Sequence, residues 1–486
     1  MGNYLGVFDT AEEAVQAAAA AQKDLMRNYT TDQRQAMIDM IRAELGPMIP
    51  EFAQMEFDET GYGRVEDKIQ KDTGAILLSP GTEAVPTNVY ASSSGLTMEY
   101  WAPFGVIGAV TPVTNPFATI IANTIVMVAG GNSVVFNAHP AAKLCSVTAC
   151  DLVNKAIMKA GGPCNLATMP AEPTMETLDV IMAAPEVTLL VGTGGPGMVK
   201  TLMSSGKKVV AAGPGNPPSI IDSTADVKKA AAAITASATF DNNLLCIAEK
   251  EIFCLADVYD EFIAELEAVG NYHMTREEAM KVTEVGIVET PNGGHATNKK
   301  FVGKHAKVIL AAAGIDVGDA DPRMAFFDAE FDDLYVQVEQ LQPIIPVVKV
   351  ATFDEAVEKA YAAEHHNRHS SSIWTKDPYH VTQFGKLIET TVYVQNGGTM
   401  AAFGIGGSGS NSPTIATPTG EGVTGPRSFC RIRRFAMADG AGSPAPRRTE
   451  ENEKRTAHRA ALFLCAGDEG FEPSLTVLET VALPLN

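Results

Sequence analysis

The first seventy residues carry apolar side chains at the spacing expected of helices. Thr10 and Glu13 have capping-box spacing before an alanine-rich run that ends near Arg27. Thr30 and Gln33 repeat this spacing. An apolar face then follows at helical intervals, formed by Met37, Ile38, Ile41 and Leu45. We predict two helices here that pack against the rest of the protein.

Short apolar runs alternate with helical patterns from Trp101 onward. Three runs have the length of buried strands, at 105–112, 132–136 and 187–191. Two longer segments have a helical pattern, at 120–129 and 141–160. Strands that alternate with helices predict an α/β fold with a parallel, doubly wound sheet. Such sheets bind nucleotides at the carboxyl ends of their strands.

A second alternating region begins after Pro218. It contains a helical pattern near 228–237 and strand-like runs at 250–254, 344–350 and 391–395. We expect this region to be the catalytic domain. The glycine-, serine- and proline-rich segment 404–425 is typical of an extended arm.

The composition changes after Asp439, where Gly-Ser-Pro-Ala-Pro precedes two arginines and a charged run. This pattern predicts a disordered tail over 439–486. The alternatives are a short partner-binding helix from Glu450 to Leu464 and a segment unrelated to function.

Composition excludes several classes of partner. The chain has 486 residues, 45% of them hydrophobic, and a net charge of -21, which disfavours nucleic acid and anionic membranes. No run approaches the ~18 apolar residues that a membrane helix needs, and the N-terminus lacks a secretory signal. Seven cysteines without CxxC spacing indicate reduced thiols. We therefore expect a soluble, cytoplasmic enzyme of two or three domains.

Cys246 is the candidate nucleophile among these thiols. It follows Asn242 and Asn243, whose amides are expected to donate to a thiolate or an oxyanion without taking the thiol proton. A buried structural cysteine, our interpretation of Cys150 and Cys254, is the alternative for this residue considered alone.

Four segments together resemble the aldehyde dehydrogenase superfamily, and specifically its CoA-acylating branch. They are Gly-Val-Ile-Gly-Ala-Val-Thr-Pro-Val-Thr-Asn-Pro at 105–116, Gly-Thr-Gly-Gly-Pro-Gly at 192–197, Ala-Gly-Pro-Gly-Asn-Pro-Pro at 212–218 and Asp-Asn-Asn-Leu-Leu-Cys-Ile-Ala-Glu at 241–249. The resemblance extends over roughly residues 5–438. It is closest to acetaldehyde and propionaldehyde dehydrogenases of bacterial microcompartments and to clostridial butyraldehyde dehydrogenases.

This resemblance implies an architecture. A Rossmann-type NAD-binding domain is expected from 1–85 and 101–220, an α/β catalytic domain from 221–405, and a small oligomerisation arm from 86–100 and 406–438. Homodimers or homotetramers follow by analogy. A microcompartment shell or cargo partner is a further alternative, although the N-terminus shows no targeting helix.

The resemblance also implies roles for residues near Cys246. Cys246 would attack the aldehyde and carry the acyl group as a thioester. Thr114 or Asn115 would donate to the oxyanion, an Asn-Pro turn being the structural alternative. His365 and His369, in the cluster Glu-His-His-Asn-Arg-His, match a Glu-His-x-x-x-His segment. They would assist thiol deprotonation, or alternatively interact with a helix dipole. No carboxylate or cysteine spacing completes a metal site with these histidines.

The cofactor residues are implied in the same way. Glycines after a strand let a backbone approach the phosphates of NAD, which assigns this role to Gly192, Thr193, Gly194, Gly195 and Gly197. Asn137 and His139 fall where the superfamily recognises the adenosine ribose. Asn137 replaces the usual lysine, which leaves NAD or NADP open. Glu339, in Glu-x-x-x-Pro, would hold the nicotinamide ribose, or alternatively is a solvated glutamate.

The residue at 212 indicates which acceptor takes the acyl group. Hydrolytic members carry a glutamate there that activates water, whereas this chain has Ala212. Loss of a general base typically costs ~10²–10⁴ in rate, while a thiol supplies its own nucleophile. The sequence therefore predicts reversible conversion of a short aliphatic aldehyde, CoA and NAD to acyl-CoA and NADH. The alternatives are a reductase for succinyl-CoA or an acyl phosphate, and a non-catalytic compartment protein.

Overall fold

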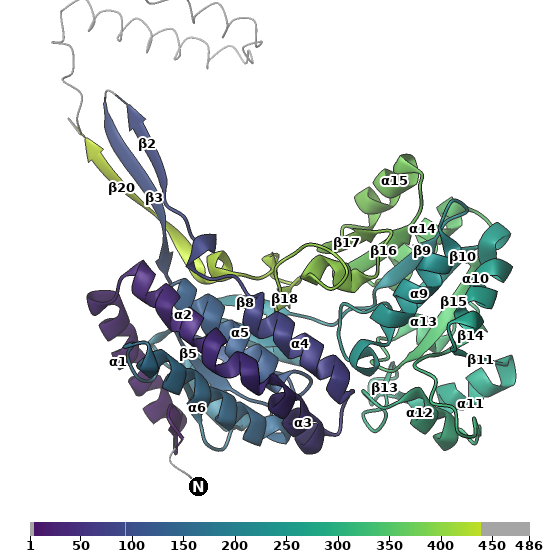
Figure 1. Cartoon of the computed structure of the whole chain (residues 1–486), viewed down its shortest axis with the longest axis horizontal. Coiled ribbons are helices and arrows are strands. Elements are labelled where there is room, and N and C mark those ends of the chain that lie inside the picture. Colours follow the sequence, from purple (N-terminus) through teal and green to yellow (C-terminus); the bar gives the residue numbers. More distant parts are fainter. Residues whose placement is uncertain (1–3, 93, 439–486) are drawn as a thin grey trace, which may run out of the picture. The chain divides into compact units, whose positions relative to one another are not determined.

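The computed structural model describes residues 4–92 and 94–438 (Figure 1). Contacts divide the chain into two units. The larger comprises 1–86 and 101–432, and the smaller begins with 87–100 and continues from 433. The predicted tail over 439–486, with its proposed helix, lies outside the described residues.

The first half of the larger unit is built on a six-stranded sheet in the order β1-β6-β5-β4-β7-β8, and every strand pair in it is parallel. Its strands are β1 (Val7–Phe8), β4 (Val106–Val110), β5 (Ser133–Asn137), β6 (Ala167–Pro170), β7 (Val187–Thr193) and β8 (Lys208–Ala212). The helices of this half are α1 (Ala11–Asn28), α2 (Thr31–Leu45), α3 (Ile49–Thr60), α4 (Val65–Leu77), α5 (Pro116–Ala129), α6 (Lys143–Lys159), α7 (Met175–Ala183) and α8 (Pro196–Met203).

The second half contains a seven-stranded parallel sheet in the order β11-β14-β15-β10-β9-β16-β17. Its strands are β9 (Pro218–Ile221), β10 (Glu251–Leu255), β11 (Tyr272–Met274), β14 (Ala325–Ala329), β15 (Ile344–Val350), β16 (Ser370–Trp374) and β17 (Val392–Gln395). Its helices are α9 (Val227–Ala238), α10 (Ala256–Ala268), α11 (Arg276–Gly286), α12 (Ala306–Ala312), α13 (Leu334–Gln337), α14 (Phe353–Ala363) and α15 (Pro378–Ile388). A hairpin, β12 (Ile287–Glu289) and β13 (His295–Thr297), accompanies them.

The predicted α/β class with parallel sheets is confirmed. Both capping boxes form, with Thr10 and Thr30 accepting from the backbones of Glu13 and Gln33. The structure differs at the predicted border of the two domains, since residue 220 lies inside β9. That strand pairs with β10 and β16, so all of it belongs to the second sheet.

The segment 406–432 also differs from the predicted arm. It groups with the larger unit and contains the short pair β18 (Ile415–Ala416) and β19 (Gly422–Val423). Ile415 and Ala416 are buried, and β18 contacts β8. Ala416 packs into the core of the first sheet, and Ile415 packs in the hydrophobic cluster with Met400 and Phe403. The smaller unit contains most of a three-stranded sheet formed by β2 (Asn88–Ser92), β3 (Gly95–Pro103) and β20 (Cys430–Ala438). Residues 101–103 of β3 and 430–432 of β20 belong to the larger unit.

Over 4–92 and 94–438, no helix combines the length and the apolar character needed to cross a bilayer. Over the same residues, no group of three or more histidine, cysteine, aspartate or glutamate side chains is arranged to hold a metal ion.

Candidate active site

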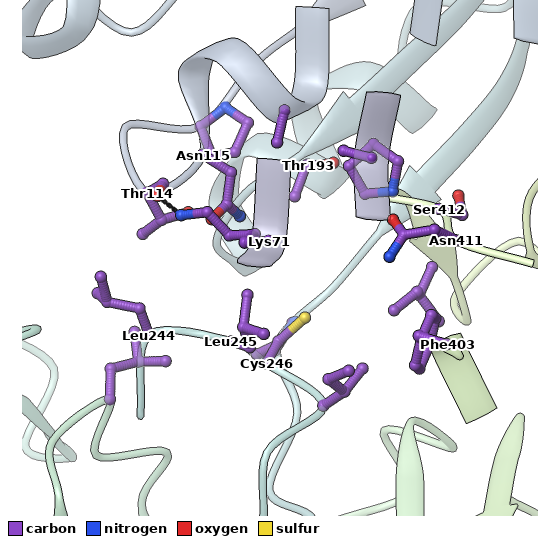
Figure 2. A pocket seen from close by; sticks show the side chains of 18 of the residues that line it. Lys71, Thr114, Asn115, Thr193, Leu244, Leu245, Cys246, Phe403, Asn411 and Ser412 are labelled. Atoms are coloured by element: carbon purple, nitrogen blue, oxygen red, sulfur yellow. Dashed lines mark hydrogen bonds between the residues drawn. The ribbon is translucent and has the colours of Figure 1, made fainter. Parts of the chain in front are cut away.

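A cavity of about 310 Å³ in the larger unit brings together loops from both parallel sheets (Figure 2). The loops after β4, β7 and β8 form one part of its lining. The segments around Cys246, Glu339 and Phe403, residues 411–413 and 415, and the α4 residues Lys71 and Ala75 also line it. The loops of the first sheet come from the carboxyl ends of parallel strands, where such sheets bind ligands.

Cys246 lines this cavity from a tightly turned segment. The three residues Asp241, Asn242 and Asn243 have φ values of 51°, 56° and 65°, which lie in the left-handed region. Aspartate and asparagine tolerate this conformation better than other residues with a Cβ. The turn brings the partly exposed Cys246 to the pocket, where Figure 2 shows its sulfur.

The two asparagines do not serve the thiol as predicted. The Asn242 amide donates to the carbonyls of Gly63 (3.2 Å) and Gly303 (2.9 Å). The Asn243 amide donates to the carbonyl of Ala238 at 2.7 Å. The prediction that these amides hold a thiolate is therefore wrong, because their donors are used to build the turn.

The environment of Cys246 keeps its thiol protonated. Burial raises the pKa of Cys246 to about 12, and the carboxylate of Glu339 acts in the same direction. The ammonium of Lys250 opposes both by lowering the pKa. A thiol with this pKa is a weak nucleophile at neutral pH, so the reaction needs additional positive charge or a base.

Thr114 and Asn115 line the cavity on the loop that precedes α5. The Asn115 side chain does not cap the helix, and its Oδ1 is buried without a hydrogen-bond partner. The Thr114 carbonyl accepts from Lys71 Nζ at 3.2 Å, which fixes the loop (Figure 2). Of the two candidates, Asn115 presents an amide that no described residue occupies.

A buried cluster of charged side chains supports the turn before Cys246 and the loop that carries Asn115. The sequence patterns did not predict this cluster. Lys71 Nζ lies 2.8 Å from Asp241 Oδ2, and Lys68 Nζ lies 3.2 Å from the same oxygen. Glu56 pairs with Lys68 at 3.4 Å and accepts from the backbone N–H of Phe117 at 2.9 Å. The cluster thus joins helices α3 and α4 to the turn before Cys246 and to the start of α5.

The protonation state of Asp72 balances this cluster. Both Asp72 oxygens are buried without a partner. Burial raises the pKa of Asp72 well above its usual value, the charge of Glu56 adds to the shift, and Lys71 and Lys68 oppose it. A neutral Asp72 leaves the two lysines facing two carboxylates, those of Glu56 and Asp241.

The glycine-rich loop after β7 fits a cofactor at some of its positions. Gly194 and Gly195 line the cavity, and the Thr193 hydroxyl is buried without a partner. A Cβ at Gly195 would meet no atom within 4 Å, so the space before α8 is open. Gly192 differs, because a Cβ there would lie 2.1 Å from Leu202 and block the packing of α8. Gly197 lies within α8 and does not line the cavity.

Asn137 and His139 lie away from the cavity lining. Asn137 is buried, and its amide donates to the Thr174 carbonyl at 3.1 Å and accepts from the Thr177 hydroxyl at 2.8 Å. His139 accepts from the backbone of Ala141 at 3.2 Å. Both side chains therefore stabilise local structure at the end of β5 and the start of α7.

Glu339 lines the cavity, and its Oε1 accepts from the backbone N–H of Gly215 at 3.2 Å. A Cβ at Gly215 would lie 2.6 Å from the Cys246 carbonyl and 2.9 Å from the His369 ring. Only a glycine allows the three segments to approach this closely. Gly215 thus lies in close contact with Glu339, Cys246 and His369.

The two matched histidines occupy different environments. His369 is fully buried, its Nδ1 lies 2.8 Å from the Ser370 hydroxyl, and its Nε2 has no partner. Burial and the charge of Lys250 lower the pKa of His369 to about 3, so the ring is neutral. His365 is exposed, and its Nε2 lies 2.9 Å from the Gln337 carbonyl. Neither lines the cavity.

The structure places Ala212 at the end of β8, buried, with its carbonyl accepting from the Gly194 N–H at 3.4 Å. Gly213 and Pro214 continue from it into the cavity lining. Among the described lining residues, Glu339 is the one carboxylate, and it is bound to the Gly215 backbone. The cavity therefore holds no carboxylate from the position of the hydrolytic base.

Comparison with known proteins gives consistent matches over this region. Residues 8–414 match the model of the aldehyde dehydrogenase family. An acetylating acetaldehyde dehydrogenase of Bilophila wadsworthia is 41% identical over 441 residues, covering 89% of this chain and 90% of that protein.

Two solved structures are similar in fold and sequence. A propionaldehyde dehydrogenase from the Clostridium phytofermentans fucose utilisation microcompartment aligns with a TM-score of 0.86 and 42% identity, covering 90% of this chain and 99% of that one. A Rhodopseudomonas palustris propionaldehyde dehydrogenase with bound CoA and an acylated cysteine aligns with a TM-score of 0.86 and 39% identity, covering 89% and 98%. The predicted resemblance to acylating enzymes is confirmed.

Proposed function

Because the chain belongs to the aldehyde dehydrogenase family, we propose that it is a CoA-acylating aldehyde dehydrogenase that carries its substrate as a thioester on Cys246. The observation that carries this proposal is the composition of the cavity and of the strand end beside it. The cavity presents the thiol of Cys246 and the amide of Asn115. Ala212, which precedes the lining residues Gly213 and Pro214, stands where the family resemblance places the base of hydrolytic members. The relatives with acylating names support the same activity.

The first half of the reaction forms the thioester. The Cys246 thiol loses its proton, and its sulfur bonds to the carbonyl carbon of the aldehyde, which places negative charge on the carbonyl oxygen. The Asn115 amide, with backbone donors, stabilises that oxygen. Loss of hydride from the same carbon restores the carbonyl and leaves an acyl thioester on Cys246.

NAD, or NADP, supplies the hydride acceptor when it is bound. The buried Thr193 hydroxyl and the open space at Gly195 fit the phosphates of a dinucleotide, and Glu339 fits its ribose. We assign Gly194 to the same contact, while Gly192 and Gly197 shape α8. The side chains of Asn137 and His139 form local hydrogen bonds. These two residues would therefore contact the dinucleotide only through their main chain or at the outer rim of its site.

The second half transfers the acyl group to CoA. The CoA thiolate bonds to the thioester carbon, the bond to Cys246 breaks, and acyl-CoA leaves while the cysteine is regenerated. Water competes poorly, because no described carboxylate replaces the base absent at Ala212. One thioester is exchanged for another of similar energy, so the sequence of steps is reversible. We propose that His365 or His369 assists deprotonation of the incoming thiol.

The apolar lining supports a short aliphatic aldehyde. Beside Cys246, the cavity is lined by Met400, Phe403, Ile405 and Ile415, which belong to or pack on one hydrophobic cluster. Lys71 is the one cation among the described lining residues, and its ammonium is already bound to Thr114 and Asp241. A succinyl or other anionic substrate would lack a free cation there.

The domain roles and assemblies follow from the family. We propose that the half of the larger unit built on the first sheet binds the dinucleotide and that the half built on the second sheet carries the nucleophile. We propose that the β2-β3-β20 sheet serves oligomerisation. Exposed apolar side chains on that sheet, including Val89, Tyr90 and Phe435, support the last role. We propose a homodimer or homotetramer and, by likeness to a microcompartment enzyme, residence in or near such a compartment.

The test is NADH production from propionaldehyde with and without CoA, in the parent and in Cys246→Ala. We expect CoA-dependent turnover that the substitution abolishes. Cys164→Ala, which removes another partly exposed thiol, is the matched control and should remain active. Turnover independent of CoA would overturn the acylating assignment, and an active Cys246→Ala variant would overturn the cysteine mechanism.

A further inference from the structure

Lys250 places a buried ammonium against the segment that carries the nucleophile. Its side chain is fully buried. Its Nζ donates to the Asn243 carbonyl at 3.1 Å, to Asn243 Oδ1 at 2.5 Å and to the Leu245 carbonyl at 3.1 Å. An ammonium has three N–H donors, so all of them serve the residues immediately before Cys246.

The main chain of Lys250 is anchored to two other parts of the cavity wall. Its N–H donates to the Pro217 carbonyl at 2.9 Å, and its carbonyl accepts from Gln340 Nε2 at 2.7 Å. Pro217 follows the lining residues Gly213 and Pro214, and Gln340 follows Glu339. Lys250 therefore connects two wall segments to the segment that carries the nucleophile.

The charge of Lys250 is not neutralised by a direct ion pair. Within 4–92 and 94–438, no carboxylate oxygen lies within the 4.0 Å limit of an ion pair with its Nζ. Burying an ammonium without a paired carboxylate is costly. Buried ionisable groups beside a cavity are candidates for a functional role.

Five other titratable groups surround this ammonium and Cys246. Glu339 faces the cavity, and Glu249 Oε1 accepts from the Thr399 backbone N–H at 2.8 Å. Glu251 is buried near Glu364, and both carboxyl groups have pKa values raised by burial. His369 is neutral. Burial lowers the pKa of Lys250 to about 8, while Glu339 and Cys246 act to raise it.

We propose that Lys250 is a positioning residue for the reaction, because it fixes residues 243–245 and supplies the positive charge next to which the Cys246 thiolate forms. The role rests on the proposed thioester chemistry. It operates twice in the cycle, since Cys246 is a thiolate when it attacks the aldehyde and again when the acyl group passes to CoA. Glu339 opposes this charge in the free protein.

The test is alkylation of the full chain by iodoacetamide as a function of pH, with modification of Cys246 followed by mass spectrometry. Because Cys246 is mostly protonated at pH 7.5, its alkylation rate there follows the small fraction of thiolate, and in Lys250→Gln we expect this rate to fall about tenfold or more. Lys250→Arg keeps the charge and should recover much of the rate. Lys349→Gln, an exposed lysine on β15, is the control and should match the parent.

Glu339→Gln provides a second test that does not require Lys250 to be replaced. It leaves the Lys250 charge unopposed, so the alkylation rate at pH 7.5 should exceed that of the parent. Equal rates in the parent and Lys250→Gln, or equal rates in the parent and Glu339→Gln where Lys250→Gln does not fold, would overturn the role of Lys250. Alkylation needs no aldehyde, NAD or CoA, so this result is separate from a failure of CoA-dependent turnover.

Discussion

Lys71 and Asp241 form a buried ion pair with Nζ and Oδ2 2.8 Å apart, although 170 residues separate them in the chain. The same ammonium donates to the Thr114 carbonyl. One lysine on α4 therefore positions both the turn before Cys246 and the loop that carries Asn115. The distance between the candidate nucleophile and the candidate amide donor depends on this contact.

Replacing Lys71 should destabilise the protein strongly. In Lys71→Met, Asp241 remains buried without one of its two cations, and breaking a buried pair costs about 3–5 kcal/mol. Urea unfolding, followed by circular dichroism, measures this loss. Lys281→Met removes an exposed pair with Glu277 and should change stability by no more than about 0.5 kcal/mol. Similar losses in the two variants would contradict the structural importance of the Lys71 pair.

Asp72 should make stability depend on pH in an unusual direction. Burial and the charge of Glu56 raise its pKa in the folded protein, so between the ordinary value of ~3.9 and the raised value the folded state holds a proton that the unfolded chain has released. The free energy of unfolding must then fall as pH rises. In Asp72→Asn this decline should disappear. The free energy of unfolding of the variant, relative to that of the parent, should therefore rise by up to about 1.4 kcal/mol per pH unit.

Unfolding of the parent and Asp72→Asn at several pH values between 4 and 8 measures this difference. Asp332→Asn, at an exposed position, is the control and should follow the parent. A difference between the parent and Asp72→Asn that stays constant with pH would mean that Asp72 is not protonated in the folded state.

Local signals in the sequence predicted much of the fold. Thr10 and Thr30 predict helix starts through capping interactions within four residues. The apolar run at 132–136 lies within one residue of the observed strand β5. The approach of distant segments could not be predicted in this way. The local sequence predicts that Asn242 and Asn243 donate to a thiolate, but the Asn242 amide donates to the carbonyl of Gly303, which is distant in the chain.

The sequence does carry a signal for the charged cluster. Lys71 and Asp72 follow Lys68 by three and four residues, and Ala75 follows them by four and three. The three charged side chains therefore share one face of α4 with the apolar Ala75. Charges in line with apolar positions predict a buried ionic contact more than a solvated face. The partner, Asp241, still required the folded chain.

Asn115 should contribute to the chemical step and little to stability. Its side chain does not cap α5, and neither its Oδ1 nor its Nδ2 forms a hydrogen bond with a described residue. Asn115→Ala therefore removes the Nδ2 donor that we propose for the oxyanion without removing a structural contact. Loss of one such donor lowers kcat by about 10²–10³. Steady-state kinetics with propionaldehyde and CoA measure the effect. Asn411→Ala, another amide in the lining, should retain kcat far better, and equal losses would argue against the assignment.

A glutamate at position 212 should redirect the acyl group to water. Ala212→Glu introduces a carboxylate at the position of the hydrolytic base, next to the lining residues Gly213 and Pro214. We expect NADH production without CoA to rise, with free carboxylic acid as the product. Ala212→Gln has nearly the same size but cannot take a proton, so it should not show this rise. Equal hydrolysis in the two variants would remove the explanation based on the missing base.

His369 should contribute no ionisation to a pH profile of kcat/KM. Burial and Lys250 lower its pKa to about 3, so its ring stays neutral from pH 5 to 9. An acidic limb in the profile of the parent should therefore persist in His369→Gln. Loss of that limb in His369→Gln would mean that the buried ring titrates within this range.

The same shift predicts an effect of His369 on stability. The unfolded chain binds a proton to this histidine below its ordinary pKa of ~6.5, whereas the folded ring stays neutral until about pH 3. The free energy of unfolding must therefore fall as pH decreases through this interval. His369→Gln should show a weaker fall, measured by urea unfolding between pH 4 and 7. His366→Gln replaces an exposed neighbour and is the control, which should behave like the parent.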